Sequence, residues 1–294
     1  MKVGLFLLPL KGSPQLLAAI ARAAEDRGLD SIWVPEPHLL IFENYTSVYP
    51  YSPDGKMPEE YGTDTDGELD GLLSLAYLAA VTDRIRLGIG VCIVPQRNPV
   101  YTAKDVTTLD RLSNGRFDFG VGIGWLAEEF EGVGVSYARR GSRTREYIDV
   151  MKSLWGEPRA EYAGEFFSLP ESHQDPKPLQ QPHPPIHFGG NSASARNRVA
   201  DQGQGWLPWD ISPEEAQQGI AQLSELLTER GRGREDIQVS VAMEIADHQI
   251  DVEAYARAGV DQLVIVTPEI DGADAIEPAL DLIVTRVGER AHAL

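Results

Sequence analysis

Eight short, continuously apolar segments alternate with amphipathic stretches along this chain of 294 residues. Their apolar residues follow one another without the two-residue alternation of a half-exposed strand, which is typical of parallel strands buried on both faces. Helix-start signals mark the intervening stretches, the clearest being the capping-box pattern of Ser212, Pro213 and Glu215. The expected strands are Val3 to Leu8, Ser31 to Val34, Ile85 to Val94, Phe117 to Ile123, Pro185 to Gly190, Gly205 to Trp209, Gln238 to Ile245 and Gln262 to Thr267.

This alternation continues without a break in composition and predicts an α/β fold, a single (β/α)8 TIM barrel domain over residues 1–294. A doubly wound open sheet would give the same alternation and stays an alternative. Two insertions interrupt the spacing, residues 35–70 after the second strand and 125–180 after the fourth. The first is rich in Pro, Tyr, Gly and Asp and indicates a lid or binding loop, while Ala163 and Gly164 in the second predict a hairpin.

Composition excludes several classes of partner. A formal net charge of -19 argues against nucleic-acid binding, which needs a basic face. The single cysteine, Cys92, forms no internal disulfide, and no apolar run is long enough to span a bilayer. The apolar run at the N-terminus is too short for a signal peptide, so we expect a cytoplasmic protein with neither a nucleic-acid nor a membrane partner.

The glycine pair Gly189-Gly190 closes one expected strand and is followed by Asn191 and Ser192, which are both N-cap residue types. Glycines let a backbone approach a phosphate closely, and the start of a helix attracts negative charge. The segment therefore indicates an anion site, although a plain strand-to-helix turn would have the same sequence.

Other chemistries lack their signatures. His183 and His187 are separated by prolines that prevent a helix from aligning them on a metal, so we expect no metal site. No Gly-x-Ser-x-Gly follows a strand, and the dinucleotide-binding GxGxxG is missing.

Five segments, in order, resemble the luciferase-like monooxygenase superfamily, especially its branch that uses the deazaflavin coenzyme F420. The resemblance implies hydride transfer between F420 and a small organic substrate, in a protein that forms a homodimer. The alternatives are an FMN-dependent monooxygenase served by a partner reductase and a non-catalytic flavin-binding protein. The segments are GLDSIWVPEPH, YPYSPDGKMPEEY, the long run from TDRIRLGIGVCIVP to GVGIGWLAEEF, PKPLQQPHPPIHFGGNS and GQGWLPW.

The resemblance also implies where the cofactor lies. A bulge with a non-prolyl cis peptide bond, at Gly90-Val91 or at Val91-Cys92, would support the ring. Ile123 and Gly124 would lie near the ring and its side chain, whereas Gly120 would merely leave open space in the barrel. The phosphate would lie on Gly189, Gly190 and Asn191, and Trp206 would line the pocket wall.

The family places an acidic residue, commonly followed by histidine, at the end of the second strand. Here the acid is Glu36, but Pro37 takes the histidine position and the imidazole follows as His38. We interpret Glu36 and His38 as the catalytic pair, with Glu36 also facing the cofactor, and leave open that His38 hydrogen-bonds locally in the loop. Expected substrate contacts are Tyr49, Trp125 and Trp209.

Two groups of arginines are candidates for the site. Arg97 follows the third strand and is expected at the mouth of the site. The four arginines between Arg139 and Arg145 are expected to form a solvated helix face that pairs with Glu146 and Asp149, with anion binding as the alternative.

Overall fold

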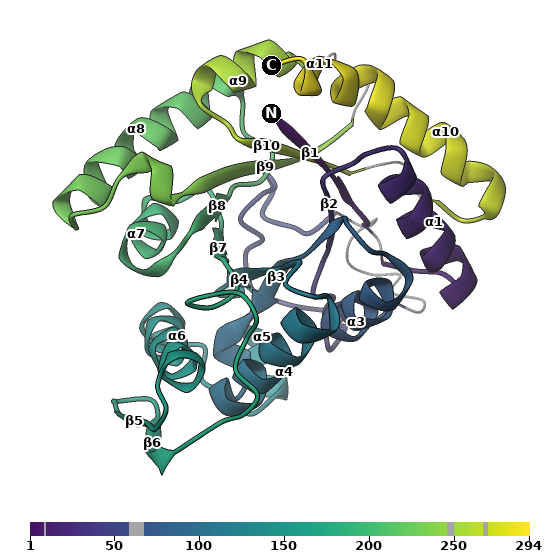
Figure 1. Cartoon of the computed structure of the whole chain (residues 1–294). Coiled ribbons are helices and arrows are strands. Elements are labelled where there is room, and N and C mark those ends of the chain that lie inside the picture. Colours follow the sequence, from purple (N-terminus) through teal and green to yellow (C-terminus); the bar gives the residue numbers. More distant parts are fainter. Residues whose placement is uncertain (9, 59–67, 246–249, 267–269) are drawn as a thin grey trace.

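All eight expected strands form in the computed structural model, which describes residues 1–8, 10–58, 68–245, 250–266 and 270–294. The strands are parallel, and the first pairs with both the second and the last, so the sheet is a closed barrel (Figure 1) and the open-sheet alternative is wrong. Thr267, the end of the last expected strand, lies outside the described residues. The barrel strands are β1 (Lys2–Phe6), β2 (Ser31–Val34), β3 (Arg86–Ile93), β4 (Phe117–Gly122), β7 (Ile186–Gly189), β8 (Gly205–Leu207), β9 (Gln238–Glu244) and β10 (Gln262–Val266).

Helices surround the barrel, as Figure 1 shows for the arc from α8 to α10. Within the described residues, none of them is both long and apolar enough to cross a membrane. The α-helices are α1 (Pro14–Asp26), α3 (Gly71–Val81), α4 (Pro99–Leu112), α5 (Ala127–Gly132), α6 (Arg140–Gly156), α7 (Ala193–Gln202), α8 (Pro213–Glu229), α9 (Val252–Ala258), α10 (Ala273–Ile283) and α11 (Glu289–His292), joined by the 3-10 turns η1 (Val94–Gln96) and η2 (Arg234–Asp236) and the π-helical η3 (Val284–Gly288).

Local capping explains where α8 begins. The Ser212 hydroxyl accepts a hydrogen bond from the Glu215 amide at 3.2 Å, and the Glu215 carboxylate accepts one from the Ser212 amide at 2.8 Å. These two bonds satisfy amides that a helix start leaves without partners. The predicted capping box is therefore confirmed.

Two groups of buried side chains hold the barrel together. The larger lies between the strands and the surrounding helices and includes Leu75, Phe117 and Leu223. The smaller fills the inside of the barrel and contains Phe6, Trp33, Leu207, Ala242, Val264 and Val266. This inner group leaves the carboxyl ends of the strands open above it, where a site can form.

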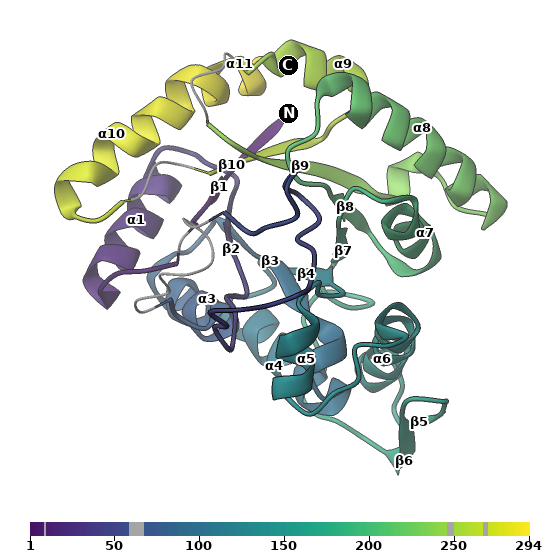
Figure 2. The ribbon, with the colours of Figure 1, turned by 180° about the vertical axis from the view of Figure 1, so that it is seen from behind.

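The two insertions behave differently. Residues 35–58 contain no helix or strand and cross in front of the barrel strands in Figure 2. The second insertion contains α5, α6 and a hairpin of β5 (Ala160–Ala163) and β6 (Ser168–Ser172), so the predicted hairpin is confirmed. Figure 1 shows this hairpin outside the barrel, so only the start of the second insertion lies near the strand ends.

The pairing of β3 with β4 is interrupted between Ile89 and Cys92, and the peptide bond Gly90-Val91 is cis, as predicted. At this interruption the Ile89 carbonyl oxygen occupies the space beside Gly120, where an added Cβ would lie 1.8 Å from it. The expectation that Gly120 merely leaves open space is therefore wrong. The glycine is required because the neighbouring backbone occupies the place of a side chain.

We expect Gly120→Ala to lower the free energy of unfolding by about 3 kcal/mol, because the new methyl group collides with backbone that cannot rotate away. Urea unfolding followed by circular dichroism measures the change. Gly156→Ala is the control: it lies at the end of α6 with no atom within 4 Å of an added Cβ, so it should be neutral or stabilise by up to about 1 kcal/mol. Equal stability of the two variants would contradict this account of Gly120.

Candidate active site

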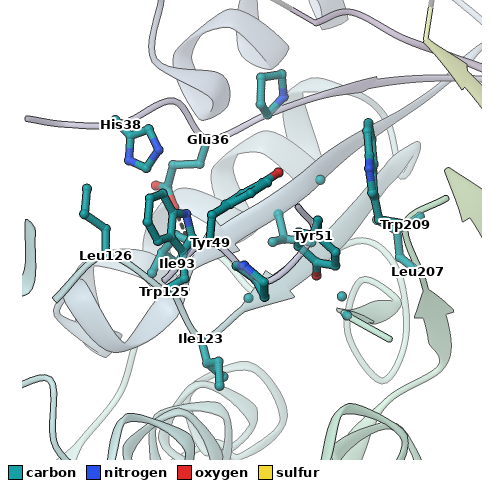
Figure 3. A pocket seen from close by; sticks show the side chains of 18 of the residues that line it. Glu36, His38, Tyr49, Tyr51, Ile93, Ile123, Trp125, Leu126, Leu207 and Trp209 are labelled. Atoms are coloured by element: carbon teal, nitrogen blue, oxygen red, sulfur yellow. Dashed lines mark hydrogen bonds between the residues drawn. The ribbon is translucent and has the colours of Figure 1, made fainter. Parts of the chain in front are cut away.

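A cavity of about 520 Å³ opens at the carboxyl ends of the barrel strands. Phe6, Leu207 and Ala242 from the inner core line it, and so do residues from the 35–58 segment and from the start of the second insertion. Its volume falls in the ~300–1,000 Å³ range of small-molecule sites. Figure 3 shows His38, Glu36 and Leu126 on one side of the cavity and Leu207 and Trp209 on the other.

Most of the residues predicted for the site line this cavity. They come from the ends of β2, β3, β4, β7 and β8 and from the two insertions, which lie far apart in the sequence. The group consists of Glu36, His38, Tyr49, Gly90, Val91, Ile123, Gly124, Trp125, Gly189, Gly190, Asn191 and Trp209.

Cys92 and Trp206 do not line the cavity, contrary to prediction. Successive side chains of a strand point to opposite faces, so Val91 and Ile93 face the cavity while Cys92 is buried in the outer core. Trp206 likewise faces α8, where an added Cβ on Gly219 would lie 2.3 Å from its ring. Its indole N–H donates to the Gly190 carbonyl at 2.9 Å, so Trp206 supports the glycine pair from behind.

Glu36 is a buried carboxylate in the cavity wall. Its oxygens accept hydrogen bonds from Arg97 at 2.5 Å and from the Ile93 amide, which ties the end of β2 to the end of β3. Burial raises the pKa of Glu36, and the Arg97 charge and the Ile93 amide offset only part of this rise. Arg97 lies behind Glu36 and 3.6 Å from Asp105, rather than at the mouth of the site as expected.

His38 lies in the cavity wall and is held there by Glu129, a residue that sequence reasoning missed. The His38 Nδ1 lies 3.3 Å from a Glu129 oxygen, and that carboxylate also accepts from the Leu39 amide at 2.8 Å and from Gln96 at 2.8 Å. Burial works to raise the pKa of Glu129, but the hydrogen bonds from His38 and Gln96 outweigh it and lower that pKa. An ionised Glu129 accepts only, so we assign the proton of neutral His38 to Nδ1 and leave Nε2 as an acceptor.

The glycine-pair end of the cavity is basic. Gly190 has a φ of +109°, and its amide donates to the Leu207 carbonyl at 3.2 Å. Arg140 and Arg198 line this part of the cavity, and the buried Nε of Arg198 has no hydrogen-bond partner among the described residues. Burial, and then the charge of Arg140, lower the pKa of Arg198. Two neighbouring guanidinium groups of this kind could hold an anion.

Sequence reasoning also missed Arg198. Its position near the start of a helix that follows a glycine pair could have identified it.

Of the four clustered arginines, Arg140 lines the cavity and donates to the Gly124 carbonyl at 2.9 Å. Within the described residues no ion pair joins these arginines to Glu146 or Asp149, although the charge of Arg145 acts on Asp149. Glu146 accepts from the Phe166 amide at 2.7 Å, and Asp149 accepts from Gln202 at 2.6 Å.

Aromatic side chains from the 35–58 segment pack on Trp125. The Tyr49 and Tyr45 rings meet it edge to face at 5.2 and 5.5 Å between ring centres, and His38 does so at 5.7 Å. Figure 3 shows Tyr49 between the His38 and Trp209 sides of the cavity. These rings give this side of the cavity an aromatic wall.

Glu128, next to Glu129 in α5, fastens the same segment at a second point. Its carboxylate accepts hydrogen bonds from the Thr46 amide at 2.6 Å and the Thr46 hydroxyl at 2.9 Å. It also accepts from the Ser47 hydroxyl at 2.6 Å and the Ser47 amide at 3.3 Å. These bonds, with the Ser47 hydroxyl first, lower the pKa of Glu128 to about 2. Adjacent glutamates of α5 therefore hold the segment through its backbone.

Comparisons with known proteins agree on the family. A family model described as luciferase-like monooxygenase matches residues 1–280. An uncharacterized protein of Mycobacterium tuberculosis is 33% identical over 261 residues, which cover 88% of this chain and 89% of that protein. The FMNH2-dependent dimethylsulfone monooxygenase of Pseudomonas putida is 30% identical over 212 residues, 69% of this chain and 55% of that enzyme. A solved F420-dependent secondary alcohol dehydrogenase, in complex with an F420–acetone adduct, has the same fold, with a TM-score of 0.77 and 16% identity over 98% of both chains.

We expect Glu128→Gln to release the segment around Thr46 and Ser47, because a neutral amide accepts these hydrogen bonds less strongly than a carboxylate. Hydrogen exchange of the two amides at pH 7 should accelerate at least about tenfold, which corresponds to about 1.4 kcal/mol. Glu131→Gln, in the same helix with an exposed side chain, is the control and should leave the exchange unchanged.

The same contact has a defined pH dependence. The folded pKa of Glu128, about 2, lies below its ordinary value of 4.5. The stabilisation is therefore fully present above pH 4.5 and is lost as the pH falls toward 2. Exchange rates of Thr46 and Ser47, corrected for the intrinsic rate, should rise only in that interval. A rise that is complete by pH 5 would contradict the assignment.

Proposed function

The chain belongs to the luciferase-like monooxygenase family, and on that premise we propose that it is an F420-dependent oxidoreductase that transfers hydride between the coenzyme and a small organic substrate. The observation that carries the proposal is the pair of arginines at the glycine end of the cavity. Arg140 and Arg198 are the only lysine or arginine side chains among the described residues that line the cavity, and the Arg198 Nε is buried without a partner in that part of the chain. Such a donor needs an acceptor, and the phosphate of a cofactor would supply one.

The rest of the cavity fits a flat ring joined to that anion. An added Cβ on Gly90 would lie 2.9 Å from the Phe6 ring, and one on Gly122 would lie 2.5 Å from Val91. The glycines therefore let Phe6 and Val91 pack closely against the bulge, and both side chains line the cavity. We assign the ring to Gly90, Val91, Ile123 and Gly124.

The phosphate would lie at the other end, on Gly189, Gly190 and Asn191. Because the Gly190 amide already donates to Leu207, the arginines and the start of α7 would supply most of the attraction for it. Asn191 is itself held in place, since its side chain donates to the Trp209 carbonyl at 2.7 Å and accepts from the Trp209 amide at 2.9 Å.

A bound deazaflavin supplies the hydride chemistry, and the protein supplies placement and a proton site. His38 provides that site at Nε2, while Glu129 holds the ring by Nδ1 and stabilises the imidazolium that forms when Nε2 takes a proton. Glu36, whose pKa is raised by burial, is a second carboxyl in the same wall. Tyr49 and Trp125 exclude water from the reacting groups.

A second candidate is an FMN-dependent monooxygenase that receives reduced flavin from a partner reductase. The 30% identity to the FMNH2-dependent dimethylsulfone monooxygenase favours it. The resemblance of several segments to the F420-using branch supports the first candidate, as does the shared fold with an F420-dependent dehydrogenase. Both require the same ring and phosphate sites.

We expect the purified protein to bind F420 more tightly than FMN, and Arg198→Gln to weaken binding of F420 by about 10- to 100-fold. A hydrogen bond to a charged group contributes about 1.5–3 kcal/mol, which gives this range. Equilibrium dialysis against each cofactor, followed by absorption of the bound fraction, measures both affinities.

Arg159→Gln is the matched control, because Arg159 forms an exposed ion pair with Glu171 on the outer hairpin at 2.6 Å. It should leave both affinities unchanged. Tighter binding of FMN would favour the second candidate. Absence of binding by either cofactor, or an Arg198→Gln affinity equal to that of the control, would overturn the assignment of this cavity.

A further inference from the structure

Residues 49–55 form a turn within the 35–58 segment, and the backbone of this turn is bonded to itself. The Tyr49 amide donates to the Gly55 carbonyl at 2.8 Å, and the Gly55 amide donates to the Ser52 carbonyl at 3.1 Å. Gly55 has a φ of +71°, a conformation that glycine adopts readily and that closes the turn. Among the described residues, no backbone hydrogen bond joins the turn to the barrel.

Tyr51, within this turn, reaches the glycine-pair end of the cavity and lines it. An added Cβ on Gly190 would lie 3.6 Å from the Tyr51 hydroxyl oxygen, so that oxygen lies directly beside the glycine. Burial raises the pKa of the Tyr51 hydroxyl, and the charge of Arg198 offsets only part of the rise. The hydroxyl therefore keeps its proton at pH 7 and is available to donate a hydrogen bond.

The protein itself does not use this donor. In the described part of the chain, the Tyr51 hydroxyl has no hydrogen-bond partner. The Arg198 Nε lacks one in the same residues. Two donors from separate elements, the turn and α7, thus lie at one end of the cavity without an acceptor. A phosphate group has several acceptor oxygens and can bind donors that approach from different sides.

From this arrangement we propose that Tyr51 is a further binding residue of the phosphate site, and that its hydroxyl donates to the anion that Arg198 also binds. The inference rests on the proposed function, because it takes this anion to be the phosphate of the cofactor. The bound phosphate then ties the 49–55 turn to α7.

The effect of the phosphate extends to the rest of the cavity through aromatic contacts. The Tyr51 and Tyr49 rings meet edge to face at 5.6 Å between ring centres, and Figure 3 shows the two side chains next to each other in the cavity. Tyr49 packs in turn on Trp125. A phosphate that holds Tyr51 therefore also holds Tyr49, so binding of the cofactor fixes the aromatic wall beside which a substrate lies.

Hydrogen exchange tests this coupling without any measurement of turnover. F420, FMN and inorganic phosphate are each added to the full-length protein at pH 7, at concentrations that saturate the binding measured by calorimetry. Ligands whose binding Arg198→Gln weakens occupy this site. Each of them should slow exchange of the Tyr49 and Gly55 amides at least about fivefold, because a ligand bound to the turn opposes its local opening.

Tyr51→Phe isolates the hydroxyl, since phenylalanine keeps the ring that packs on Tyr49. It should weaken F420 binding about tenfold, the lower end of the range for a hydrogen bond to a charged group. At saturation, the Tyr49 and Gly55 amides of this variant should exchange equally fast with and without ligand. Each variant is compared with its own free form, so a general loosening of the turn does not affect the result.

Tyr101→Phe is the matched control, because Tyr101 lies on α4 and is 75% exposed. It should retain both the affinity for F420 and the slower exchange of the turn. Circular dichroism of both variants verifies folding.

Failure of this inference is distinguishable from failure of the proposed function. If F420 or FMN binds but leaves exchange of the turn unchanged, or slows it equally in Tyr51→Phe, the role of Tyr51 is overturned while the proposed function stands. If neither cofactor binds, the proposed function fails and inorganic phosphate decides the inference. Slower exchange of the turn that requires the Tyr51 hydroxyl would then support it, and its absence would overturn it.

Discussion

The interrupted pairing between β3 and β4 is the constraint on which the site depends. The Ile89 carbonyl enters the space beside Gly120, so the following residues leave the ladder and Val91 turns toward the cavity. Gly122 and Gly189 flank Val91 so closely that an added Cβ on either would lie within 3 Å of its methyl groups. Glycines on three neighbouring positions of two strands thus make room for one bulge, and the bulge forms one wall of the cavity.

A short helix controls the other wall. α5 begins at Ala127, shortly after β4 ends at Gly122, and its adjacent glutamates contact two separate parts of the 35–58 segment. Glu128 binds Thr46 and Ser47 at a solvent-facing point, whereas Glu129 is largely buried and binds Leu39 and His38. Because these bonds go mainly to backbone amides, they specify the path of the segment rather than its side chains. The orientation of His38 follows from that path.

The two ends of the cavity differ in charge. Arg140 and Arg198, which have no carboxylate partner within the described part of the chain, lie toward the glycine pair, and carboxylates with internal partners lie toward His38. Arg198 is half-buried, and its buried Nε–H has no acceptor among the described residues, which is unfavourable unless a ligand supplies one. The same reasoning explains why we place the anionic part of a cofactor at the glycine-pair end.

The strands, their order and the glycine positions of the site depend on local patterns, and the sequence by itself determined them. Apolar runs, N-caps and glycine pairs act over a few residues, so they are visible without a fold. Only the tertiary structure decided that Glu129 holds His38, that Arg198 reaches the cavity beside Gly190, and that Cys92 and Trp206 face away from it. The physical reason is that these facts depend on which face of a strand a side chain occupies and on contacts between residues up to 91 positions apart. A pattern of a few neighbouring residues predicts neither.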